Sequence, residues 1–262
     1  MNFPILSAKV QTPILSVRDL TKTYGGRIGC AEVSFDLFPG EVLGIVGESG
    51  SGKSTLLSCL AGHIAPDHGQ VIWDGTTDTL RLPEALRRRL MRTDWAFVHQ
   101  NPRDGLRMGV SAGGNVGERL MGAGARHYGQ IRDKAEDWLA RVEIEPGRID
   151  DRPRQFSGGM QQRLQIARNL VTGPRLVFMD EPTGGLDVSV QARLLDLLRG
   201  LVRRMGLSVI IVTHDLAVVR LLADRLMVMK SGHVVEQGLT DQVLDDPQHG
   251  YTQLLVSSVL QV

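Results

Sequence analysis

Cysteine is scarce in this sequence, since Cys30 and Cys59 are the only two among 262 residues. Two cysteines cannot form a disulfide framework, and their separation matches no zinc-binding motif. They also cannot supply the set of thiolates that holds an iron–sulfur cluster. The sequence therefore argues against a secreted disulfide-rich domain and against iron–sulfur chemistry, and it favours the cytoplasm.

Long hydrophobic runs and an excess of positive charge are missing as well. No segment approaches the roughly 18 consecutive apolar residues that a membrane-spanning helix needs. Residues 1–10 lack the basic start and apolar core of a secretory signal. The chain has 30 basic and 29 acidic residues, which gives a formal net charge of +1. This balance argues against a surface built to hold nucleic acid or anionic lipid.

What is present is the composition of an ordinary globular protein, with 42% hydrophobic and 23% charged residues. The length allows one large domain or two small ones. Only 5 of the 30 basic residues are lysines. A lysine inside a specific motif is therefore easy to notice.

Short apolar segments alternate with helical patterns along most of the chain. Strands are expected at residues 15–20, 33–37, 42–46, 95–98, 176–179, 208–212 and 226–229. Helices are expected at residues 53–60, 188–205 and 215–222, and two short ones, broken at Pro247, between residues 240 and 262. This alternation predicts a mostly parallel sheet that is covered on both faces. From residue 102 to residue 170 helical patterns replace the strands, which indicates a helical insertion.

The loop after the strand at residues 42–46 carries a complete phosphate-binding motif, Gly-Glu-Ser-Gly-Ser-Gly-Lys-Ser. Glycines let backbone N–H groups turn onto phosphate oxygens, and the following helix directs the positive end of its dipole at them. Lys53 supplies a charge for the β- and γ-phosphates, and the Ser54 hydroxyl can bind Mg²⁺. The predicted nucleotide site comprises Gly47, Glu48, Ser49, Gly50, Ser51, Gly52, Lys53, Ser54 and Thr55.

Two adjacent carboxylates follow the apolar strand at residues 176–179. If this strand lies beside the strand of the phosphate loop, Asp180 reaches the metal ion. Glu181 is then placed to polarise the attacking water as a general base. The alternative is a plain acidic turn after a strand, and the phosphate loop favours the functional interpretation.

Residues 156–163, with the sequence Phe-Ser-Gly-Gly-Met-Gln-Gln-Arg, resemble the signature motif of the ATP-binding cassette (ABC) ATPases. The resemblance covers nearly the whole chain. It implies that Tyr24 stacks on adenine and that Gln100 joins the two lobes and contacts the metal ion. It also implies that His214 senses the γ-phosphate and that residues 185–187 form a loop at a dimer seam.

In this family two cassettes pair head to tail, and each ATP is held between the phosphate loop of one and the signature motif of the other. Ser157, Gly158 and Gly159 open a helix, so their N–H groups and hydroxyl can form a second phosphate cradle. The resemblance thus implies an ATPase that uses ATP and Mg²⁺, dimerises on ATP binding and loosens on hydrolysis. Phe156 and Met160 depart from the usual leucine and glutamine, but neither replaces a group that touches phosphate.

The insertion carries a narrower resemblance. Residues 98–107, 110–120 and 124–129, together with residues 256–260, resemble the cassettes of bacterial phosphonate carbon–phosphorus lyase systems. This implies an ATPase subunit that docks on the lyase core complex and supports phosphonate degradation, while another subunit cleaves the carbon–phosphorus bond. The second cassette of the dimer is then an identical chain or a related one.

Two other functions compete with this interpretation. Residues 245–252 resemble the tail of oligopeptide importers, so the alternative is an ATP-binding subunit of an importer for oligopeptides or phosphonates, which would contact a membrane. A cassette acting on DNA or ribosomes is disfavoured, because such proteins usually carry two cassettes or a long coiled-coil insertion and this chain is not basic. No nucleic-acid partner is therefore expected.

A dense basic cluster precedes the strand at residues 95–98, namely Arg87, Arg88, Arg89 and Arg92. It either docks an acidic partner or forms a solvated helix face.

Together these patterns predict an α/β fold, in which a P-loop NTPase core of the ABC type carries an antiparallel β-subdomain and an inserted α-helical subdomain. The expected ATP-binding core comprises residues 14–101 and 171–240. The helical subdomain with the signature motif is expected at residues 102–170, and a C-terminal helical tail at residues 241–262.

Overall fold

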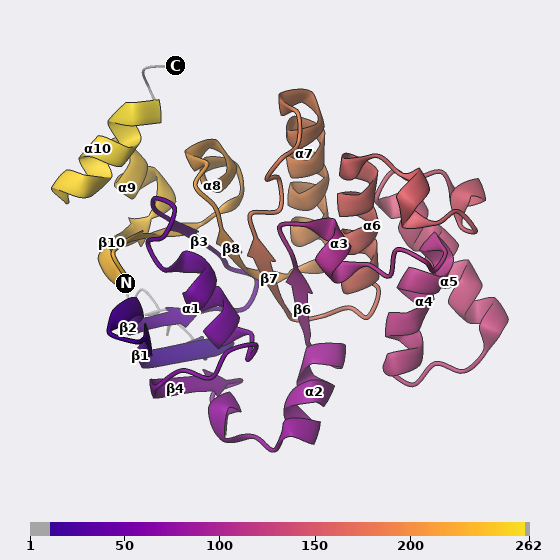
Figure 1. Cartoon of the computed structure of the whole chain (residues 1–262), viewed down its shortest axis with the longest axis horizontal. Coiled ribbons are helices and arrows are strands. Elements are labelled where there is room, and N and C mark those ends of the chain that lie inside the picture. Colours follow the sequence, from indigo (N-terminus) through magenta and orange to yellow (C-terminus); the bar gives the residue numbers. More distant parts are fainter. Residues whose placement is uncertain (1–10, 260–262) are drawn as a thin grey trace, which may run out of the picture.

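A computed structural model describes residues 11–259, so the last residues of the predicted tail, 260–262, lie outside the described part. The chain forms two β-sheets with helices between and around them (Figure 1). The strands are β1 (Leu15–Tyr24), β2 (Arg27–Leu37), β3 (Val42–Val46), β4 (His68–Trp73), β5 (Thr77–Asp78), β6 (Trp95–Val98), β7 (Leu176–Asp180), β8 (Ser208–Val212), β9 (Arg225–Lys230) and β10 (His233–Leu239). The α-helices are α1 (Lys53–Leu60), α2 (Glu84–Thr93), α3 (Pro102–Gly105), α4 (Ala112–Gly122), α5 (Tyr128–Arg141), α6 (Gly158–Leu170), α7 (Val188–Met205), α8 (Leu216–Leu222), α9 (Thr240–Asp245) and α10 (Gly250–Val259). Short 3₁₀ helices occupy Thr79–Arg81, Pro146–Arg148 and Pro153–Gln155.

The larger sheet has the strand order β10-β9-β3-β8-β7-β6. All neighbours from β9 to β6 are parallel, and only β10 pairs antiparallel with β9. The mostly parallel sheet is therefore as predicted. Strand β10 was not predicted, because its residues are exposed or half-buried and form no apolar run.

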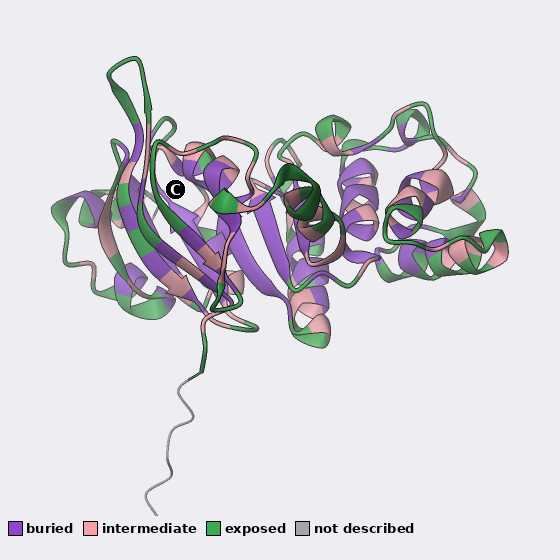
Figure 2. Ribbon diagram, turned by 90° about the horizontal axis from the view of Figure 1, so that it is seen from below, coloured by how far each residue is buried: buried purple, intermediate pink, exposed green. Residues whose placement is uncertain are grey.

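Side chains of the central strands alternate between two hydrophobic clusters, one on each face of the larger sheet. Phe178 and Ile210 belong to the cluster around α1, whereas Val177 and Val209 belong to the cluster around α6 and α7. Successive residues of a strand point to opposite faces, so a strand covered on both sides must be apolar throughout. Figure 2 shows the resulting buried band of central strands.

The smaller sheet is antiparallel, with the order β2-β1-β4-β5. Its buried side chains, such as Leu15 and Val17, share a cluster with Leu56 and Leu57 of α1. Helix α1 is thus packed between the two sheets (Figure 1). The helix that follows the phosphate loop is therefore held from both sides.

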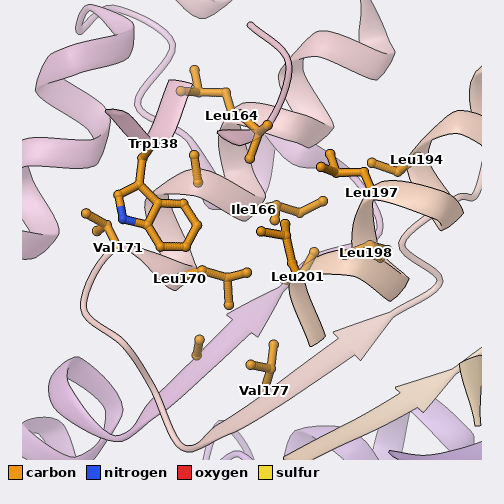
Figure 3. Close-up of a cluster of buried hydrophobic side chains, with 14 of the residues drawn as sticks. Trp138, Leu164, Ile166, Leu170, Val171, Val177, Leu194, Leu197, Leu198 and Leu201 are labelled. Carbon is orange, nitrogen blue, oxygen red and sulfur yellow. The ribbon is translucent and has the colours of Figure 1, made fainter. Parts of the chain in front are cut away.

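Residues 102–170 contain the helices α3 to α6 and no strand. Helix α6 attaches them to the rest of the chain, because its side chains pack against both α5 and α7. Figure 3 shows Trp138 of α5, Ile166 of α6, Leu201 of α7 and Val177 of β7 in one cluster. The predicted helical subdomain is present, while the predicted limits of the three units stay predictions.

No helix between residues 11 and 259 combines the length and the apolar character that a membrane span requires.

Helix α7 should make a large contribution to stability through this cluster. Leu198 is fully buried in the cluster, so Leu198→Ala should lower the free energy of unfolding by about 2 to 5 kcal/mol. Equilibrium urea denaturation measures this change. Leu254→Ala on α10, where the side chain is 69% exposed, is the matched control and should change stability by less than about 0.5 kcal/mol. Equal losses in the two variants would contradict the assignment of this core.

Candidate active site

The phosphate loop runs from the end of β3 to the start of α1, over residues 47–52. Gly47 has φ 151° and Gly52 has φ 104°, values that side-chain-bearing residues rarely adopt. A Cβ atom on Gly47 would lie 2.1 Å from the Met229 carbonyl oxygen, and one on Gly52 would lie 2.0 Å from that of Gly29. Both glycines are therefore required by close approach to β9 and β2 as well as by their backbone angles.

Lys53 folds back over its own loop and is only 5% exposed. Its Nζ donates hydrogen bonds to the carbonyl oxygens of Gly47 at 2.7 Å and Glu48 at 2.8 Å. Burial lowers the pKa of Lys53, while the carboxylates of Glu181, Asp180 and Glu48 act in the opposite direction. The loop backbone thus holds the ammonium group at the site where a phosphate would bind.

Asp180 and Ser54 are in contact, because the Ser54 hydroxyl donates to Asp180 Oδ1 at 3.1 Å. The expectation that β7 lies beside β3 is wrong, since β8 lies between them. Asp180 reaches Ser54 because α1, which begins at Lys53, packs against both β8 and β7. Burial raises the pKa of Asp180, and the Ser54 hydrogen bond and the Lys53 charge oppose this shift.

The donor set at this corner fits Mg²⁺. The Ser54 hydroxyl and the Asp180 carboxylate are hard oxygen ligands, which Mg²⁺ prefers. Among residues 11–259 no group of three or more histidine, cysteine, aspartate or glutamate side chains is placed to hold a metal ion. A few protein oxygens completed by phosphate and water suit Mg²⁺ better than a dedicated protein cage would.

Glu181 contacts two other predicted site residues, Gln100 and His214. Its Oε2 accepts from Gln100 Nε2 at 2.9 Å, and its Oε1 lies 3.1 Å from Nδ1 of His214. These residues follow β6, β7 and β8, whose carboxyl ends meet at one edge of the sheet. Glu181 also has φ 40°, an uncommon backbone conformation, and its N–H donates to the Val212 carbonyl at 2.8 Å. Such strain is typical of functional positions.

Tyr24 ends β1 and is 45% exposed. Its ring lines a cavity beside the phosphate loop, together with Arg27, Ile28, Gly50 and Thr55. An exposed aromatic ring at the mouth of this cavity fits a stacking contact with a base. Arg27 and Ile28 were missed by sequence reasoning, because neither belongs to a motif.

Ser157 caps helix α6, and its Oγ accepts from the N–H of Met160 at 3.3 Å. Gly158 begins the helix and lines a separate cavity with Gln100 and residues 184–186. Gly159 packs closely on α7, because a Cβ atom there would lie 2.5 Å from Val190. In the hydrogen-bond network of residues 11–259, nothing joins residues 157–159 to the phosphate loop. Gly158 and the loop residues Gly50 and Gly52 line separate cavities within the chain.

Two buried glutamines of α6 connect the signature helix to the end of β6. Gln162 lies within the motif at residues 156–163, whereas Gln165 was missed by sequence reasoning. Gln165 Oε1 accepts from the N–H of His99 at 2.6 Å, and its Nε2 donates to the His99 carbonyl at 3.1 Å. Gln162 Nε2 donates to the same carbonyl at 3.3 Å. Their spacing of three residues, which places both side chains on one side of a helix, was the available signal. The helix that carries the signature motif is thus tied to the residue before Gln100.

The phosphate loop, the acidic pair after β7 and the capped signature helix define a P-loop nucleoside triphosphatase of the cassette type. Comparison with known proteins agrees with this class. The family model described as "ABC transporter" matches residues 30–184. The chain therefore belongs to the ABC transporter ATP-binding family, as the signature motif predicted, and it is an ATPase.

Two individual proteins of this family show how similar the chain is to its relatives. The chain is 68% identical over 249 residues to the "Putative phosphonates utilization ATP-binding protein PhnK" of Escherichia coli K12, covering 95% of this chain and 98% of that protein. It is 41% identical over 228 residues to the oligopeptide transport ATP-binding protein OppF of Salmonella typhimurium, covering 87% of this chain and 68% of that protein.

Solved structures show the same fold. The dimeric post-hydrolysis state of the ATP-binding cassette MJ0796, bound to ADP and Pi, has a TM-score of 0.79 and 31% identity, and the match covers 86% of this chain and 98% of that chain. The cassette cbiO1 of Clostridium perfringens, part of the ABC transporter complex cbiONQ, has a TM-score of 0.79 and 29% identity, and the match covers 89% of this chain and 91% of that chain.

The close approach of Gly52 to the Gly29 carbonyl can be tested by substitution. Gly52→Ala must move the loop, because its Cβ would overlap the Gly29 carbonyl, so nucleotide affinity should fall at least about tenfold. Titration with a fluorescent ATP analogue measures the affinity. Gly173→Ala is the matched control, because Gly173 also has a positive φ but has open space around it; it should bind nucleotide normally. Equal affinities of the two variants would contradict the role of this contact.

Proposed function

We propose that this protein is the ATPase subunit of a phosphonate-utilisation system and docks on a carbon–phosphorus lyase core complex. The observation that carries the proposal is the 68% identity to PhnK over nearly the full length of both chains, since the name of that protein assigns it to phosphonate utilisation. The oligopeptide-transport relative OppF is less similar, at 41% identity, and the match covers 68% of its length. We therefore prefer the lyase-associated function to that of an importer subunit.

The phosphates of the substrate ATP bind to residues 47–55, and its adenine stacks on Tyr24. Ser54, Asp180 and Gln100 would hold Mg²⁺, which would supply positive charge to offset the charge on the phosphate oxygens. Lys53, whose ammonium group is held by the carbonyl oxygens of Gly47 and Glu48, contacts the β- and γ-phosphates. The short distance from Ser54 to Asp180, 3.1 Å, and the burial of Lys53 support these roles.

Glu181 is the general base. Its two oxygens contact Gln100 and His214, which orient the carboxylate and leave further lone pairs to accept a proton from water. Gln100, which contacts Oε2 of Glu181, would position the water and the metal ion. His214, which contacts Oε1 of Glu181, senses the γ-phosphate. The backbone strain at Glu181 supports a functional role for this position.

A second cassette, identical or related, completes the site. Ser157, Gly158 and Gly159 of one chain meet the phosphate loop of the other, with ATP between them. The separation of these two cradles within one chain supports a head-to-tail dimer. The dimeric MJ0796 structure, whose match covers 86% of this chain at 31% identity, supports the same arrangement.

The general base and the phosphate-binding lysine are tested together. Glu181→Gln keeps the size of the side chain and one acceptor oxygen but removes the carboxylate that takes the proton, so ATP hydrolysis should fall at least about 100-fold. An ATP-bound dimer should then accumulate, which size-exclusion chromatography with light scattering detects. Lys53→Ala should bind no nucleotide in the fluorescent titration and should stay monomeric. Hydrolysis by Glu181→Gln at the unmodified rate would contradict the general-base assignment.

The basic cluster on α2 offers the docking surface. Arg88 and Arg92 line a cleft with His63 and His99, and Arg119 and Arg168 line the same cleft. Arg88 is also paired with Glu84 along the helix. Arg89 belongs to the same exposed helix but does not line the cleft. His99 precedes Gln100, so an acidic partner segment in this cleft would lie next to the hydrolysis site.

Docking is tested with charge reversal on the cleft side of α2. Arg88→Glu with Arg92→Glu should lower co-purification with a tagged lyase core at least about tenfold, because the basic lining is lost. Arg89→Glu is the matched control on the same helix and should keep the parent yield. All variants should bind nucleotide normally. An unchanged yield for the double variant rejects this surface, and recovery of membrane-spanning proteins in place of the lyase core would support the importer function.

A further inference from the structure

Helix α10 reaches the phosphate loop from the other end of the chain. The backbone N–H of Glu48 donates a hydrogen bond to Oη of Tyr251 at 3.0 Å. Tyr251 is 6% exposed, and its ring belongs to a hydrophobic cluster with Val46 at the end of β3. Nζ of Lys230 lies 4.8 Å from the ring centroid. The hydroxyl group is thus brought to the loop by a side chain that is packed in place.

The same stretch of backbone carries Lys53 on its other side. Nζ of Lys53 donates to the carbonyl oxygens of Gly47 and Glu48. The Gly47 carbonyl and the Glu48 N–H belong to one planar peptide unit. A hydrogen bond to this N–H therefore sets the direction of the carbonyl that holds the lysine. Tyr251 and Lys53 bind opposite ends of one rigid group.

The start of α10 is tethered independently of the loop. The carboxylate of Glu236 on β10 accepts from the N–H of Gln248 at 2.8 Å and from the N–H of His249 at 3.0 Å. Nδ1 of His249 in turn accepts from the N–H of Tyr251 at 3.1 Å. Strand β10 and the start of α10 thus place Tyr251 through contacts that do not involve the loop.

We propose that Tyr251 is a positioning residue for ATP binding, whose hydroxyl holds the Gly47–Glu48 peptide in the orientation that presents Lys53 to the phosphates. The inference rests on the proposed role of Lys53 as a phosphate ligand. Tyr251 acts through the loop backbone and does not itself bind the nucleotide. Burial raises the pKa of Tyr251, so the hydroxyl stays protonated in the neutral range.

The test is Tyr251→Phe in the full chain, which removes the hydroxyl and keeps the packed ring and its contact with Lys230. The KM for ATP and the dissociation constant of the fluorescent analogue should both rise about 3- to 10-fold, as expected for one lost hydrogen bond. The kcat should change less than about twofold, because the Glu181 network is untouched. Hydrogen exchange at the Glu48 amide, measured by NMR, should become faster, while Tm stays close to that of the parent. Tyr128→Phe on α5, where the ring is 73% exposed, is the matched control and should change none of these values.

Two results would overturn the inference. One is parent-like KM and parent-like exchange at Glu48 in Tyr251→Phe. The other is a lowered Tm with unchanged KM, which would show that the hydroxyl serves folding alone. Lys53→Ala separates this inference from the proposed function: if that variant still binds nucleotide, the phosphate-ligand role fails first. If it loses binding while Tyr251→Phe binds normally, only the positioning role of Tyr251 is rejected.

Discussion

The parallel alignment of β3, β8, β7 and β6 is the constraint on which the site depends. Parallel strands end at one edge of the sheet, so the segments that follow them are neighbours although they are far apart in sequence. The phosphate loop follows β3, and Gln100 follows β6. Asp180 is the last residue of β7, Glu181 comes directly after it, and His214 follows β8. The contacts of Glu181 with Gln100 and His214 are consequences of this register. Any arrangement that reversed one strand would remove its residue from the site.

The helical subdomain, residues 102–170, is joined to the core by packing and by hydrogen bonds. Helix α6 shares one hydrophobic cluster with α7 and the sheet, so the lobe cannot move as an independent body without disturbing that core. The side chain of Gln165 accepts a hydrogen bond from the N–H of His99 and donates one to its carbonyl oxygen. His99 lines the basic cleft and precedes Gln100. The cleft, the signature helix and Gln100 therefore meet at one short segment of chain.

The phosphate loop is held from several directions. Its glycines press against β2 and β9, Lys53 binds its carbonyl oxygens, and Tyr251 of α10 binds an N–H at its start. A loop that must fold its N–H groups around an anion gains from such support, since a preorganised loop loses less entropy on binding. The C-terminal helices thus contribute to the site as well as to the cluster beneath β3 and β9.

The sequence by itself determined the family, the phosphate loop and most elements that carry the site. The bounds of β3, α1, α7 and β8 were predicted correctly, because apolar runs and helical spacing are local signals bounded by glycine and proline. Tertiary structure alone decided that β8 separates β7 from β3, that β10 closes the sheet, and that Arg89 lies outside the cleft. It also revealed Gln165 and Tyr251, whose partners lie 66 and 203 residues away. Strand order and such distant contacts depend on how the whole core packs. A local pattern of side chains therefore cannot predict them.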